Sequence, residues 1–279
     1  TMSTVLENNE PFRSVFGYAL MRDEKGNEMH KSKGNAIDFV EAAERMGVDA
    51  MRWAFARHNP TQNLNFGFGT VDEVRRRFFL TLWNTYSFFV TYANIDQFNP
   101  WDVQQYWKAE VGGPALAKMS RNELDRWVVS ELNSLVASVT DLLETYNLTD
   151  AGRRVEEFVE ILSNWYVRRS RRRFWKSAND RDKECAYVTL YTCLATLARL
   201  LAPFTPFLAE KLYQNLVRSV DTGAAESVHL ALFPQSDAEL VDEELSKAIR
   251  LAMRLSSMGR AARSKGSIKV RQPLARALV

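Results

Sequence analysis

The sequence is poor in the residues that most often bind metals or form cross-links, with two cysteines and three histidines among 279 residues. Cys185 and Cys193 lie on one predicted helix, about 12 Å apart along its axis, which is too far for a disulfide bond. Free thiols are typical of a reducing compartment, so we expect a cytoplasmic protein. Because His30, His58 and His229 are scattered along the chain, the sequence predicts no metal site.

Several other patterns are missing. No apolar run reaches membrane-spanning length, and residues 1–10 have neither the basic stretch nor the apolar core of a secretory signal. No P-loop motif occurs, and strands do not alternate with helices for long enough to build a doubly wound nucleotide domain. The 46% hydrophobic content is enough for a sizeable core. These features predict one or two mostly helical domains that contact no membrane.

The chain does contain a series of amphipathic segments at helical spacing. Ser120 and Glu123 form a capping box at the start of one segment, Thr149 or Asp150 is the expected cap of the next, and Pro206 lies near the first turn of another. The predicted helices span residues 71–92, 120–146, 150–176, 181–201, 206–220 and 242–265. Long helices with short connections pack as a bundle. The predicted fold class is therefore mainly α, a helical bundle preceded by a small strand, loop and helix.

That small segment carries the most distinctive loop of the sequence. Residues 15–21 are predicted to form a strand and residues 37–45 a helix, and between them lies Glu-Met-His-Lys-Ser-Lys-Gly-Asn at residues 28–35. Lys31 and Lys33 on such a loop can supply positive charge where negative charge develops on a polyphosphate. The alternative is an ordinary solvated surface loop, which is the more common meaning of a short basic motif.

Charge is distributed unevenly along the chain. The net charge is only +3, yet residues 164–176 carry six basic side chains and residues 254–276 carry seven, with no acidic residue in either segment. The rest of the chain therefore has a net charge of −10. An acidic body with two basic segments is the pattern expected of a protein that binds a polyanion at defined places.

The first basic segment follows an apolar helical stripe, formed by Val155, Phe158, Val159, Leu162 and Tyr166. On an ideal helical projection Arg169 and Arg173 continue this stripe, whereas Arg168, Arg171 and Arg172 lie on other faces. Either the helix projects beyond the core and presents its arginines to RNA, or Arg169 and Arg173 pair with buried carboxylates. We favour the first alternative and predict RNA contacts by all five arginines, with Trp175 as a platform for an unstacked base.

Several motifs together resemble one protein family. Met29 to Asn35 resembles the KMSKS signature loop of class I aminoacyl-tRNA synthetases, and we refer to residues 29–35 as the KMSKS-like loop. The segments that resemble the carboxyl-terminal half of isoleucyl-tRNA synthetases are Arg75 to Tyr86, Leu124 to Trp127, Asn164 to Trp175, Ala202 to Phe207, Ser227 to Leu230 and Lys269 to Leu274. The likeness covers nearly the whole chain. Valyl and leucyl synthetases share the architecture and remain alternatives.

The resemblance implies roles for the loop residues. Lys31 matches the family lysine that meets the phosphates of ATP, so the resemblance implies catalysis by Lys31, Ser32 and Lys33, and ATP contacts by Met29, His30 and Lys31. Glu28 stands where the family has its first lysine, and His30 stands where it has serine. The role of that first family lysine therefore has no counterpart in this chain. Magnesium would accompany ATP, and the amino acid would be isoleucine.

The family's His-x-Gly-His cradle for ATP is absent from this sequence. We therefore expect an excised piece with three parts: the end of the catalytic region over residues 1–68, an anticodon-binding bundle over 69–250, and the start of a further domain over 251–279. Such a piece would be a monomer that binds tRNA, holds no cofactor stably and activates no amino acid. Two other hypotheses remain, a stand-alone RNA-binding module and a helical scaffold for other proteins, whose binding would depend only weakly on salt.

Overall fold

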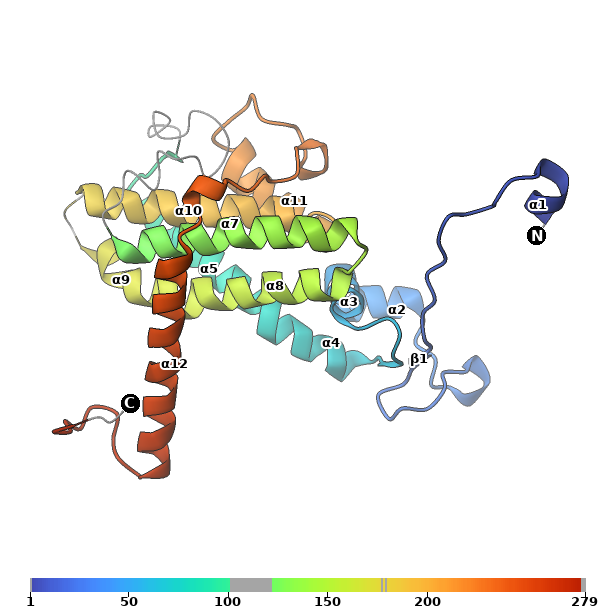
Figure 1. Cartoon of the computed structure of the whole chain (residues 1–279), viewed down its shortest axis with the longest axis horizontal. Helices are drawn as coiled ribbons and strands as arrows, with labels where there is room; N and C mark the ends of the chain where they lie inside the picture. Colours follow the sequence, from blue (N-terminus) through green and yellow to red (C-terminus); the bar gives the residue numbers. More distant parts are fainter. Residues whose placement is uncertain (1, 101–121, 177, 179, 277–279) are drawn as a thin grey trace.

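The computed structural model describes residues 2–100, 122–176, 178 and 180–276 (Figure 1). Helices dominate these residues, which confirms the predicted fold class. The bundle is formed by α5 (Leu80–Ile95), α7 (Glu123–Glu144), α8 (Leu148–Ile161), α9 (Arg168–Trp175), α10 (Arg181–Leu201) and α11 (Pro206–Tyr213). A π-helical turn, η4 (Leu162–Val167), joins α8 to α9 without a break, and a second one, η5 (Gln214–Arg218), extends α11.

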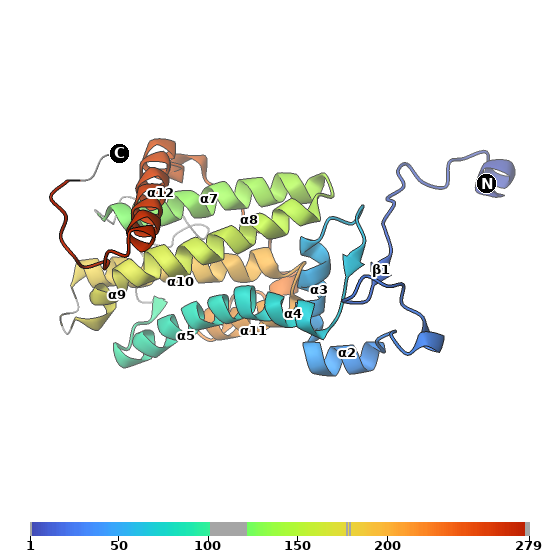
Figure 2. The ribbon, with the colours of Figure 1, turned by 90° about the horizontal axis from the view of Figure 1, so that it is seen from below.

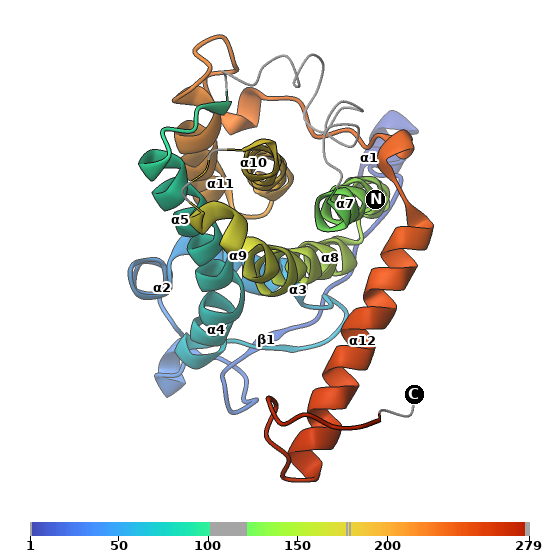
Figure 3. The same cartoon turned by 90° about the vertical axis from the view of Figure 1, so that its left-hand side faces the viewer.

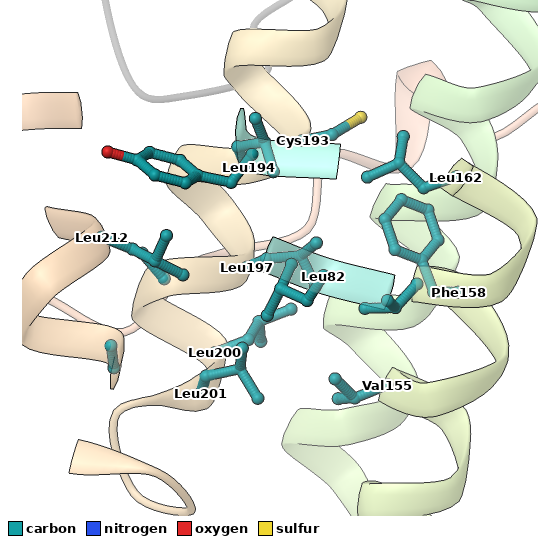
Figure 4. Packing of buried hydrophobic residues seen from close by; sticks show 14 of the residues in the cluster. Leu82, Val155, Phe158, Leu162, Cys193, Leu194, Leu197, Leu200, Leu201 and Leu212 are labelled. Atoms are coloured by element: carbon teal, nitrogen blue, oxygen red, sulfur yellow. The ribbon is translucent and has the colours of Figure 1, made fainter. Parts of the chain in front are cut away.

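Helix α10 is the centre of the bundle (Figure 3). All but four of its 21 residues are buried, and Leu194 and Leu197 are fully enclosed. In Figure 4 the leucines of α10 lie between Leu212 of α11 on one side and Phe158 of α8 and Leu162 of η4 on the other. This explains why the sequence of α10 is apolar or small almost all round, since a helix that is covered on every face has no polar side to expose. Both cysteines, Cys185 and Cys193, are buried on it.

The helix boundaries follow local capping groups. Asn122 caps α7 and accepts a hydrogen bond from the Leu124 amide at 3.0 Å, whereas the predicted cap, Ser120, lies outside the described residues. The predicted cap of α8 at Thr149 or Asp150 is wrong, because Asn147 accepts from the Asp150 amide instead. Pro206 begins α11 as predicted.

The helix predicted over residues 71–92 is part of a longer rod. It comprises α4 (Phe68–Val74), a π-helical turn η2 (Arg75–Phe79) and α5, which follow one another without a break. We call this unit of residues 68–95 the α4–α5 rod. It is about 42 Å long at 1.5 Å per residue, and it runs from the amino-terminal segment into the bundle (Figures 1 and 2).

The amino-terminal segment contains α1 (Met2–Glu7), β1 (Met21–Arg22), α2 (Phe39–Met46), α3 (Val48–Arg57) and β2 (Leu64–Asn65). The prediction of a strand over residues 15–21 is largely wrong, because only β1 pairs, in parallel, with β2. A strand requires a hydrogen-bonding partner, and β2 offers two residues. Most apolar side chains before β1 are exposed, among them Val15, Phe16 and Tyr18.

The last long helix, α12 (Glu243–Lys265), begins at its cap Asp242 and packs on α7 with its first turns. Arg250 forms an ion pair with Glu131 of α7 at 2.6 Å. Beyond this contact α12 extends away from the bundle and is mostly exposed (Figure 3). Within the described part of the chain, no helix is long and apolar enough to cross a lipid bilayer.

Candidate nucleic-acid interface

The π-helical turn η4 decides which arginines face solvent. A π turn accommodates an extra residue, so the helix emerges from it rotated relative to an ideal α-helical projection. As a result Tyr166, Val167, Ser170, Arg173 and Phe174 form the buried face. Arg169, which an unbroken helix would have turned towards the core, is exposed.

The RNA-facing prediction for Arg173 is wrong. Its side chain is 10% exposed and forms a bidentate ion pair with Asp125 of α7, with nitrogen–oxygen distances of 2.6 and 2.7 Å. Tyr166 donates a further hydrogen bond to Asp125 at 2.8 Å, and the Asp182 carbonyl accepts one from Arg173. Burial opposes the charge of Arg173, but the hydrogen bonds and charge of Asp125 outweigh it and raise the guanidinium pKa. The alternative of a buried carboxylate partner therefore holds for Arg173.

The other four arginines of α9 form an exposed basic surface. Arg168, Arg171 and Arg172 are exposed and have no ion-pair partner among the described residues. Arg169 lies over the ring of Trp165 with its guanidinium carbon 3.9 Å from the centroid, a cation–π contact. The sequence gives a signal for this pair, an arginine four positions after a tryptophan on one helix.

Helix α12 brings a fifth arginine to the same surface. The pKa of Arg169 is lowered, first by partial burial and then by the positive charges of Arg260 on α12 and Arg168. Figures 1 and 2 show α9 and α12 at the same end of the bundle, away from the amino-terminal segment. Like charges repel, so their gathering here indicates a surface for anions. We call Arg168, Arg169, Arg171, Arg172 and Arg260 the basic face.

Two further features lie on this part of the molecule. Trp175, at the end of α9, is 55% exposed, as a base platform requires. A groove of about 620 Å³ lies between α7, α8 and α12, lined among others by Trp165, Asn164, Glu157 and Met253. The groove could not be predicted from the sequence, because one of its walls comes from α12, which lies far from α7 and α8 in the chain.

The KMSKS-like loop is held by one side-chain amide. Asn35 donates to the Glu28 carbonyl and to the Asp23 carboxylate, both at 3.0 Å, and accepts from the His30 amide at 2.9 Å. Lys31–Lys33 form a single 3₁₀ turn, which Gly34 ends in the left-handed conformation (φ 68°). That conformation costs glycine little and other residues more. Asn35 therefore closes the loop across its base.

The cationic groups of the loop have no ion-pair partner in the part of the chain that the structure describes, except for a contact of His30. Lys31, Ser32 and Lys33 are exposed, and neither lysine forms an ion pair with the described residues, whereas His30 lies 3.5 Å from Glu28. Met29 is half-buried and packs against the core. The pKa of Asp23 is lowered to about 2, first by the Asn35 hydrogen bond and then by the Asn27 amide, so the anchoring carboxylate is ionised at neutral pH. Two ammonium groups on a fixed turn suit a phosphate ligand.

Two family models match parts of the chain. Residues 125–278 match the family model described as the anticodon-binding domain of tRNA ligase. The chain belongs to this family. Residues 1–67 match a second model, tRNA synthetases class I (I, L, M and V).

Individual relatives indicate which type of tRNA ligase the chain is similar to. The chain is 54% identical over 275 residues to an isoleucine–tRNA ligase of Dehalococcoides mccartyi and 44% identical over 280 residues to that of Thermus thermophilus. The matches cover 98% and 100% of this chain but 26% of each relative, so the chain spans about a quarter of their length. It is thus similar to one portion of isoleucine–tRNA ligases, which confirms the resemblance.

Solved structures show the same fold at low identity. The tRNA-bound leucyl-tRNA synthetase of Agrobacterium radiobacter K84 aligns with a TM-score of 0.63 at 20% identity, over 86% of this chain and 27% of that one. Mycobacterium tuberculosis methionyl-tRNA synthetase aligns with a TM-score of 0.58 at 18% identity, over 78% and 42% of the two chains.

Proposed function

We propose that the chain is the tRNA-binding portion of a cytoplasmic, monomeric isoleucine–tRNA ligase, which joins isoleucine to its tRNA at the expense of ATP. The observation that carries the proposal is the basic face, where exposed arginines of α9, which have no ion-pair partner among the described residues, gather with Arg260 of α12 while Arg173 is withdrawn into an ion pair. Isoleucine and ATP are proposed from the relatives. The proposed units remain residues 1–68, 69–250 and 251–279.

On the basic face, arginine forks bind phosphates of the anticodon stem-loop and fix its orientation. Trp175 and the Trp165–Arg169 pair offer flat surfaces on which unpaired bases stack. The neighbouring groove has carboxylate and amide groups, from Glu157 and Asn164, that can hydrogen-bond the edge of such a base. Phosphate contacts thus position the RNA, and base contacts discriminate it.

At the other end of the molecule, the KMSKS-like loop presents Lys31, assisted by Ser32 and Lys33, to the phosphates of ATP with its magnesium. Its ammonium groups are exposed and form no ion pair with the described residues, which fits such an anion. Met29 and His30, which precede the turn, would contact the nucleotide. Because the His-x-Gly-His cradle is not in this sequence, the 279-residue chain is expected to bind tRNA without activating an amino acid.

Reversing two charges of the basic face tests the proposal. We expect Arg171→Glu with Arg172→Glu to weaken binding of isoleucine tRNA by the 279-residue chain at least about 10-fold, because two phosphate contacts become repulsive. The slope of log affinity against log salt should fall by about 1–2, since each lost phosphate contact removes roughly 0.7–0.9. Filter binding or fluorescence anisotropy at several salt concentrations measures both.

A matched control changes the net charge equally on another surface. Arg75→Glu with Arg77→Glu alters two exposed arginines of η2, which pair with Asp72 and Glu73. This variant should keep its tRNA affinity within about 2-fold at 0.15 M salt, where the Debye length is about 8 Å. Equal losses in both double variants would show a general effect of charge and would remove the basic face from the interface.

A further inference from the structure

Helix α4 lacks a cap of its own. Its N-cap residue is Gly67, which has no side chain to accept a hydrogen bond from the first amides of the helix. The missing acceptor comes from a different segment: Glu24 Oε1 accepts from the Thr70 amide at 3.0 Å. Thr70 occupies the third helical position, and a serine or aspartate at the N-cap would normally accept a hydrogen bond from the amide at this position. Glu24 therefore caps α4 from 46 residues upstream.

Two glycines make room for this carboxylate. A Cβ atom placed on Gly67 would lie 2.2 Å from Glu24 Cγ, and one placed on Gly69 would lie 2.8 Å from Glu24 Oε1. The φ angle of Gly67 is 179°, an extended conformation that any residue adopts, so the backbone itself does not demand glycine there. Glycine is needed because the Glu24 side chain fills the space that a Cβ atom would occupy.

Glu24 belongs to the turn that anchors the KMSKS-like loop. Its neighbour Asp23 accepts hydrogen bonds from the Asn27 amide at 2.8 Å and from the Asn35 side chain at 3.0 Å, and Asn35 closes the loop. Downstream of the loop, Arg45 of α2 lies over the ring of Phe68, the first residue of α4, at 3.7 Å. The loop is thus attached to the start of α4 from both sides.

The far end of the α4–α5 rod reaches the basic helix. Phe88 of α5 packs edge-to-face on Phe174 of α9, with ring centroids 5.1 Å apart, and Phe174 adjoins the buried Arg173. One continuous helical unit therefore contacts the segments that flank the KMSKS-like loop at its start, and the buried side of the helix that carries most of the basic face near its end. Figure 2 shows the rod between the two.

We propose that Glu24 is a positioning residue. It fixes the KMSKS-like loop to the α4–α5 rod by capping α4 from a distant segment of the same chain. The hydrogen-bonded contact does not depend on the proposed function, but its use, to set the loop relative to bound tRNA, does. Removal of the contact should release the loop while the bundle stays folded.

Hydrogen exchange of the 279-residue chain, without any ligand, tests the contact. Glu24→Ala should speed exchange about 5-fold, the equilibrium equivalent of a lost helix cap, in peptides covering residues 28–36 and 67–71. Gly67→Ser separates the two effects. Its Cβ displaces Glu24, but its hydroxyl caps α4 locally, so exchange at 67–71 should stay unchanged while exchange at 28–36 rises about 5-fold.

Glu73→Ala is the control, because Glu73 is an exposed carboxylate of α4 whose ion-pair partner among the described residues is Arg77 of η2, in the same α4–α5 rod. It should leave exchange at residues 28–36 unchanged. Unaltered exchange at 28–36 in both Glu24→Ala and Gly67→Ser would overturn the proposal and reduce Glu24 to a surface side chain. Since no RNA or nucleotide is present, this result would leave tRNA binding by the basic face as a separate question.

Discussion

Arg173→Ala is expected to lower the free energy of unfolding by about 3–5 kcal/mol, the usual cost of leaving one partner of a buried ion pair uncompensated. Asp125 is 1% exposed, and without Arg173 it keeps only the Tyr166 hydroxyl among the partners described above. The second acidic neighbour, Asp182, would lose its ion pair at 2.9 Å. Urea denaturation followed by circular dichroism measures the change.

Arg172→Ala provides the matched control one position away. Its side chain is exposed and unpaired in the described structure, so the free energy of unfolding should change by less than about 0.5 kcal/mol. The affinity for tRNA should show the opposite pattern. Arg172→Ala should bind tRNA more weakly, whereas folded Arg173→Ala should bind it with nearly unchanged affinity. A stable Arg173→Ala variant with impaired tRNA binding would contradict the burial of this arginine.

The loss of stability should be smaller when both partners of the ion pair are removed together. Replacing Arg173 with methionine and Asp125 with leucine together removes both charges, and paired removal of this kind is often close to neutral or stabilising. We therefore expect the double variant to be more stable than either single one. Additive losses would show that the two side chains do not act as a pair.

The arginine helix shows where helical periodicity succeeds and where it fails. Local signals, such as proline at position 206 and the apolar spacing of α7 and α10, predicted the bundle helices almost to their ends. The projection of Arg169 towards the core failed because the η4 turn inserts a residue into the helical repeat. Nothing in Leu162–Val167 marks a π turn from composition alone.

Contacts between segments that are far apart in the chain are the features of the two sites that the sequence did not predict. The KMSKS-like loop was recognisable because its residues are contiguous, and in the structure it contains a turn that ends at Gly34. By contrast, the approach of Arg260 to Arg169 and the cap of α4 by Glu24 join residues that are 91 and 46 positions apart. The packing of α12 on α7 brings the first pair together, and the pairing of β1 with β2 helps to bring the second pair together.

In a full-length ligase that carries this chain, Lys31→Ala should lower kcat for isoleucine-dependent pyrophosphate exchange by about 10²–10³-fold. This is the typical loss when one preorganised group that stabilises developing charge is removed. Lys31 opens the 3₁₀ turn and is exposed without an ion-pair partner in the described residues, so its charge is available to a phosphate rather than to the protein. Neither the fold nor tRNA affinity should change.

Lys31→Arg and Glu28→Ala separate charge from loop order. Arginine keeps the charge but replaces a compact ammonium by a planar fork, so activity should recover only in part. Glu28 is exposed, and only its backbone carbonyl holds Asn35, so Glu28→Ala should leave the loop closed and the rate within about 2-fold. If Lys31→Ala retained full activity while Asn35→Ala lost it, the loop would act through its shape and Lys31 would carry no catalytic charge.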